Sequence, residues 1–216
     1  MSDYSETFTK VDGNTIEAAD FETEFQAIET AIATKLDVDS DTATNLTIGT
    51  GFGGGVIGTG SVIDVSTSAT SYELSTSIPS WAKKVIISYS GVNTSGTDEF
   101  ALELGNAGGY VTSGYVSGVT MTTSIASFEA TTGDFTINRS DPGASSVYTG
   151  HSILTLLNST TDLWVCSSQV YDADANSISF QCGHVALSGT LTKIKLQTKF
   201  GVDTFEGGSV SIMWGG

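Results

Sequence analysis

Short segments that alternate apolar and polar residues, separated by turn residues, fill positions 61–216 and constrain the fold most strongly. EFALELG (99–105), for example, places Phe100, Leu102 and Leu104 on one face of a strand. Turn residues such as Asp141-Pro142-Gly143 punctuate the series. The segments are SVIDVS (61–66), SYELST (71–76), WAKKVIISYSGV (81–92), EFALELG (99–105), YVTSGYVS (110–117), VTMTTSIASFEA (119–130), DFTINR (134–139), SILTLLN (152–158), DLWVCSSQVY (162–171), SISFQCGHVA (177–186), LTKIKLQTKF (191–200) and GGSVSIMW (207–214). Roughly ten to twelve short strands of this kind predict a mainly β fold, an antiparallel β-sandwich of jelly-roll type.

The charge balance limits the partners of this chain. Its 24 acidic and 8 basic residues give a net charge of −16. Such a surface repels nucleic acid backbones and anionic lipid headgroups. The first residues carry acids and no apolar stretch, and no apolar run is long enough to span a bilayer. We therefore expect a protein without a signal peptide or membrane insertion, made in a cytoplasm and free to act elsewhere.

The stretch from Thr15 to Leu36 has a different period. Its apolar residues recur at helical spacing, which predicts a helix from about Ala18 to Leu36. Acidic residues near its start suit the positive end of the helix dipole. A lone helix of this length cannot bury its stripe, so the stripe must dock on the β-domain or on copies of itself. The stripe consists of Phe21, Phe25, Ile28, Ile32 and Leu36.

The two cysteines fall in neighbouring predicted strands. If 162–171 and 177–186 form a hairpin closed by Tyr171 opposite Ser177, then Cys166 lies opposite Cys182. A reduced cross-strand pair is the plainer interpretation, because cytosolic proteins keep their thiols reduced. A disulfide formed after release from a cell is the alternative.

Two sets of polar residues are candidates for binding. Asp172, Asp174 and Asn176 follow the first spacing of an EF-hand loop, but Ser177 and Gly183 break the pattern. A surface turn is the plainer interpretation of these residues, with calcium held with help from another loop as the alternative. The second set consists of tyrosines in or beside turns, which could contact a sugar or could simply fill half-buried strand positions. These tyrosines are Tyr110, Tyr115, Tyr148 and Tyr171.

No catalytic motif stands out. His151 and His184 are the only histidines, and neither belongs to an H-E-x-x-H pattern. The Ser-rich sequence contains no G-x-S-x-G elbow. We therefore expect a protein that is not an enzyme and needs no cofactor.

Two stretches resemble bacteriophage tail-fibre and virion-associated proteins. The first is VDGNTIEAADFETEFQAIETAIATKLD (11–37), similar to the particle-proximal end of many such proteins. Its matching residues are Asp12, Gly13, Ile16, Ala19, Asp20, Phe21, Glu24, Phe25, Ile28, Ala31, Ile32 and Lys35. The second is IPSWAKKVIISYSGVNTSGT (78–97) with its continuation LELGNAGGYVTSGY (102–115).

The resemblance implies a homotrimer on the virion. Residues 1–45 would attach and trimerise through the helix, 46–60 would form a Gly-rich neck, and 61–216 would form a β-sandwich head. The N-terminus would bind a tail or baseplate protein, and the head would bind a glycan or protein of the host surface. A capsid decoration or spike protein is one alternative; a head with glycan hydrolase or esterase activity and a non-viral lectin-like module are others.

Overall fold

The computed structural model describes residues 8–9, 15–16, 25–26, 57–122, 127–139 and 146–216 of a chain that divides into two units, Met1–Thr47 and Ile48–Gly216. In the first unit, β1 (Phe8–Thr9) pairs antiparallel with β2 (Thr15–Ile16). Phe25 and Gln26 are helical, and Phe25 is 63% exposed. The other stripe residues lie outside the described residues, so the long helix and its trimer stay predictions.

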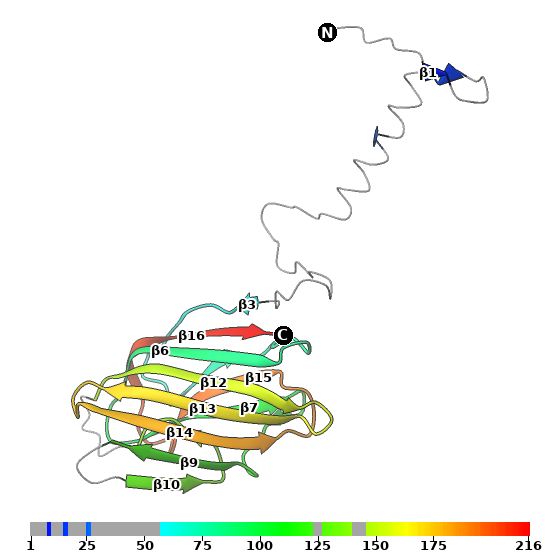
Figure 1. The fold of residues 1–216 in the computed structure, drawn as a ribbon. Coiled ribbons are helices and arrows are strands. Elements are labelled where there is room, and N and C mark those ends of the chain that lie inside the picture. The colour runs from blue at the N-terminus through cyan, green and yellow to red at the C-terminus, as the bar shows by residue number, and fades with distance from the viewer. Residues whose placement is uncertain (1–7, 10–14, 17–24, 27–56, 123–126, 140–145) are drawn as a thin grey trace, which may run out of the picture. The chain divides into compact units, whose positions relative to one another are not determined.

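Two antiparallel sheets form the described part of the second unit (Figure 1). The larger sheet contains, in spatial order, β10 (Ser127–Thr131), β9 (Val116–Met121), β14 (Ser177–Ala186), β13 (Leu163–Asp172), β12 (Tyr148–Asn158), β6 (Lys84–Thr94), β16 (Phe205–Gly215) and β3 (Ile57–Thr59), with β4 (Ile63–Asp64) also paired to β16. The smaller sheet contains β11 (Phe135–Thr136), β7 (Phe100–Asn106), β15 (Lys193–Thr198) and β5 (Ser71–Ser75), with β8 (Gly109–Tyr110) paired to β7. The prediction of a mainly β, antiparallel fold is therefore confirmed.

Both sheets contribute to one hydrophobic core. Leu102 and Leu196 come from the smaller sheet, whereas Ile87 and Leu154 come from the larger one, and all four are fully buried. Phe100 of β7 joins the sheets through edge-to-face contacts with three aromatic rings of the larger sheet, at centroid distances of 5.7 Å (Tyr89), 5.4 Å (Tyr148) and 6.4 Å (Phe205). Two sheets facing each other across one core is the layer arrangement of a sandwich.

The larger sheet combines a meander with longer connections, because β9 is a neighbour of β14 and β6 lies between β12 and β16. Strands β12, β13 and β14 follow one another in the chain and are also neighbours in the sheet. These three strands form an up-and-down meander. The jelly-roll type stays a prediction. No helix in the described part of the chain is long and apolar enough to cross a membrane.

The end of the predicted neck is part of the larger sheet. β3 pairs with the C-terminal strand, with Ile57 opposite Gly215 and Gly58 opposite Trp214. A Cβ atom on Gly58 would lie 2.1 Å from Nε1 of the Trp214 side chain. Glycine at position 58 therefore lets the Trp214 indole lie against the backbone of β3.

A chain of buried polar side chains crosses five strands on the inner face of the larger sheet. The Oγ of Ser168 donates to Oε1 of Gln181 at 2.9 Å, and Nε2 of Gln181 donates to Oγ of Ser117 at 3.1 Å. On the other side, Ser168 lies 2.7 Å from Ser152, which lies 2.9 Å from the Tyr89 hydroxyl. Each hydroxyl has one proton, so Tyr89 must donate to Ser152 and Ser152 to Ser168. All five groups are thereby satisfied inside the core.

Candidate functional site

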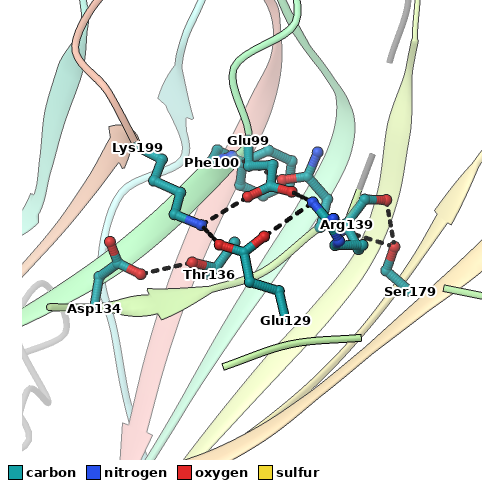
Figure 2. Close-up of polar contacts among 9 residues, drawn as sticks. Glu99, Phe100, Glu129, Asp134, Thr136, Arg139, Ser179 and Lys199 are labelled. Atoms are coloured by element: carbon teal, nitrogen blue, oxygen red, sulfur yellow. Dashed lines mark hydrogen bonds and ion pairs between the residues drawn. The ribbon is translucent and has the colours of Figure 1, made fainter. Parts of the chain in front are cut away.

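Four charged side chains form a closed network between the two sheets (Figure 2). Glu99 precedes β7, Lys199 follows β15, Arg139 follows β11, and Glu129 lies on β10. Arg139 Nη1 lies 2.8 Å from Glu99 and 2.9 Å from Glu129. Lys199 Nζ lies 2.9 Å from Glu99 and also contacts Glu129.

This network is better suited to holding the fold than to catalysis. Its two acids and two bases balance one another, and they join β10 of the larger sheet to the smaller sheet. Burial lowers the pKa of Lys199, but its bonds to Glu129 and Glu99 outweigh that effect and raise the pKa overall. The hydrogen bond to Glu99 likewise raises the pKa of Arg139. Both bases therefore stay charged, and neither is prepared to act as a nucleophile or a general base.

A second paired set covers the smaller sheet. Lys195 Nζ lies 2.8 Å from Glu103, and Gln197 donates to the same carboxylate at 2.8 Å. The Tyr110 hydroxyl donates to Glu73, while Lys195 lies 4.7 Å from the centre of the Tyr110 ring. These side chains satisfy one another and leave few groups free for a ligand.

The outer face of the larger sheet, unlike the two charged clusters, is hollowed. It contains an open hollow of about 400 Å³ over strands β9, β14, β13 and β12. The hollow is lined by Gly118, Thr120, His151, Ser167, Gln169, Phe180 and Cys182, and it also borders Ser168 and Gln181, whose side chains belong to the inner face. Small residues cause the depression, because Gly118, Cys182 and Ser167 are cross-strand neighbours.

One row of side chains borders this hollow and continues past it. Successive cross-strand pairs join Thr120, Phe180, Gln169, His151, Ser88 and Ser211. Figure 1 shows the six strands that carry them side by side: β9, β14, β13, β12, β6 and β16. Phe180 is 41% exposed. We call these six residues the outer row.

The outer row differs from the buried chain behind it in having free hydrogen-bonding groups. Within the described residues, the hydroxyl, amide and imidazole groups of the outer row form no side-chain hydrogen bond. Ligand-binding surfaces commonly combine an exposed aromatic ring with hydrogen-bond donors and acceptors that have no partner within the protein. The outer row and its hollow are therefore the best candidate binding site in the described part of the chain.

The predicted tyrosines do not form one site. Tyr115 and Tyr148 are each 1% exposed and belong to the core, so the prediction that they contact a receptor is wrong. Tyr115 accepts a hydrogen bond from the backbone of Leu104. The Tyr110 hydroxyl donates a hydrogen bond to Glu73. Of the four tyrosines, only Tyr171, which is 42% exposed, lies on the outer face of the larger sheet.

The predicted pairing of the cysteines is also wrong. The hairpin is closed by Asp172 opposite Ser177, so Cys166 faces Gly183 and Ser167 faces Cys182. Cys166 is buried and Cys182 is exposed, and both are free thiols. The same register places His184 opposite Val165. Because side chains alternate between faces, a register change of one residue moves the two thiols to opposite sides of the sheet.

The predicted calcium residues build the turn of this hairpin. Oδ1 of Asp172 accepts hydrogen bonds from the backbone N–H groups of Asp174 (3.0 Å) and Ala175 (3.2 Å). Asn176 has a φ of 46°, a left-handed conformation that asparagine tolerates. Among the described residues, no group of three or more His, Cys, Asp or Glu side chains could hold a metal ion.

Phe180 and Gln169 were not among the residues predicted from the sequence. Their signal was present in the alternation of SISFQCGHVA and DLWVCSSQVY, but it could be used only with the correct register. Neither a scan against protein-family models nor a search of curated proteins gave a match for this chain.

Proposed function

We propose that this chain is a non-catalytic attachment protein of a bacteriophage, a short tail or baseplate fibre. Its N-terminal unit binds the particle and assembles three copies through the helix predicted for 18–36. Its β-domain, a sandwich head, recognises the host surface. The site of action is the virion, after synthesis in the host cytoplasm.

One observation carries the recognition role. The charged clusters of the β-domain are paired internally, whereas the outer row offers an exposed aromatic ring and unoccupied polar groups around an open hollow. A surface with free donors and acceptors but no activated base is suited to binding and not to turnover. We accordingly assign no catalytic residue.

The resemblance of residues 11–37 to fibre N-termini supports the attachment role. The exposure of Phe25 fits a stripe that is covered only when other chains assemble. Association would rest on the stripe residues Phe21, Phe25, Ile28, Ile32 and Leu36.

Light scattering of the full chain tests the assembly. Replacing Phe25 and Ile28 together with Asp buries charge in any helical contact, so we expect a trimer to become monomeric. Gln26→Asp is a control that adds charge beside the stripe but outside it, and it should remain trimeric. A double variant that keeps its trimer would contradict this assignment of the contact.

Immunogold electron microscopy tests the position on the particle. Label at the tail tip or baseplate supports the proposal, and label spread over the head would favour a capsid decoration protein. Incubation with host polysaccharide tests the hydrolase alternative, because a binding protein releases no oligosaccharide.

A further inference from the structure

The outer row is a line of side chains that runs perpendicular to the strands. Its six side chains come from six adjacent strands, each paired with the next in register. Adjacent strands lie about 4.8 Å apart, so the row is about 24 Å long. That step is close to the advance of one hexose in an extended polysaccharide, so each sugar unit can meet the side chain of one strand.

The chemistry of the row matches a sugar chain. The Phe180 ring is exposed and can stack on the apolar C–H face of a hexose. Gln169 offers a donor and an acceptor together, and the hydroxyls of Thr120, Ser88 and Ser211 can do either. The small side chains of the hollow leave room beside the row for a substituent that projects from the sugar ring.

The charges favour a neutral glycan. The outer row contains no carboxylate, lysine or arginine, and the chain as a whole has a net charge of −16. A polyanionic polysaccharide would be repelled by that field and would find no cation along the row. The same charge disfavours nucleic acid. Along the outer row itself, the Phe180 ring is the one large apolar side chain, which is small for the apolar centre of a protein interface.

We infer that the outer row binds a neutral, linear polysaccharide laid across the strands, with Phe180 as the stacking platform and Gln169 as the main hydrogen-bonding group. This inference rests on the proposed role in host attachment and names the class of molecule that the site recognises.

Calorimetry with defined sugars tests the inference. The probes are neutral linear oligosaccharides of two to eight units, namely β-1,4-glucans, N-acetylglucosamine oligomers, mannans and α-1,4-glucans, with polygalacturonate as the anionic comparison. We expect one neutral series to bind, with affinity rising to about six units, the number of strands crossed. Polygalacturonate should bind more weakly than that series.

Variants locate the binding. Phe180→Ser and Gln169→Ala should each weaken binding roughly tenfold or more, because each removes a main contact to the sugar. Both side chains are exposed, so the fold should be kept. Phe200→Ser is the matched control, since Phe200 is an aromatic residue 67% exposed in the loop after β15. Its affinity should equal that of the unaltered chain, and circular dichroism should be unchanged for all three variants.

The results separate the inference from the proposed function. Absence of binding to every neutral series, preference for polygalacturonate, or equal affinity of Phe180→Ser and Phe200→Ser would overturn the inference. Binding that depends on Phe180, combined with absence of gold label on particles, would uphold the inference and reject the fibre assignment. Gold label on the tail without glycan binding would do the reverse.

Discussion

Asp134 shows how a single buried carboxyl can cost stability. It is 8% exposed and accepts a hydrogen bond from the Thr136 hydroxyl at 2.7 Å. Burial raises the pKa of Asp134 above its ordinary value of 3.8, and the Thr136 hydrogen bond offsets this only in part. The folded state therefore binds a proton at Asp134 more tightly than the unfolded chain does.

The sign of the pH effect follows from that preference. The contribution of Asp134 is fully present below pH 3.8 and is lost as the pH rises through the raised pKa of the folded state. Asp134→Asn removes the charge and keeps an oxygen for Thr136. We expect a higher midpoint of thermal unfolding at pH 7 and a smaller gain at pH 3.

Thermal unfolding by circular dichroism at both pH values measures this effect. Asp174→Asn is the control, because Asp174 is exposed in the hairpin turn. An equal gain at pH 7 and pH 3, or no gain at pH 7, would contradict the proposed cause.

At the scale of single elements, the buried polar side chains link five neighbouring strands of the larger sheet. Ser168→Ala removes the central link, leaving the Ser152 hydroxyl without its acceptor and Oε1 of Gln181 without its donor in a buried site. We expect a loss of about 1–3 kcal/mol in the free energy of unfolding. Ser167→Ala, on the outer face of the same strand, should change it by less than about 0.5 kcal/mol. Denaturant titrations measure the free energy of unfolding of the two variants. Equal losses for Ser168→Ala and Ser167→Ala would contradict a specific contribution of the buried polar side chains to stability.

The β13–β14 hairpin shows how far the sequence could lead. The alternation of DLWVCSSQVY and SISFQCGHVA predicted both strands, and the structure has them within a residue of the expected ends at 163–172 and 177–186. The register depended on the turn. Asp172 extends β13 by one residue and caps a four-residue loop, which only its bonds to Asp174 and Ala175 reveal.

The candidate site depended on that same register. Serine, cysteine and glutamine occur on both faces of these strands, so polarity alone could not tell the inner face from the outer one. Gln181 is buried and Gln169 is exposed, although both lie in strand segments that mix small, polar and apolar residues. The tyrosines were misjudged for a related reason, since a turn-adjacent tyrosine such as Tyr148 can still point into the core.

At the scale of the whole molecule, the β-domain has two distinct ends. At one end of the larger sheet Ile57 pairs with Gly215, and Thr155 pairs with Lys84. The opposite end of the larger sheet contains Phe205, about ten strand residues away along β16, or roughly 33 Å. The outer row lies between these ends and crosses the strands. A receptor chain could therefore lie along the row without contacting either end.

Adsorption of phage particles to host cells tests the central claim, that this β-domain recognises the host through its outer row. Purified chain in excess should occupy the receptors and lower the fraction of particles that adsorb. The Phe180→Ser chain should fail to compete, while the Phe200→Ser chain should compete as well as the unaltered one. Equal competition by the Phe180→Ser chain, or no competition by the unaltered chain, would contradict the account.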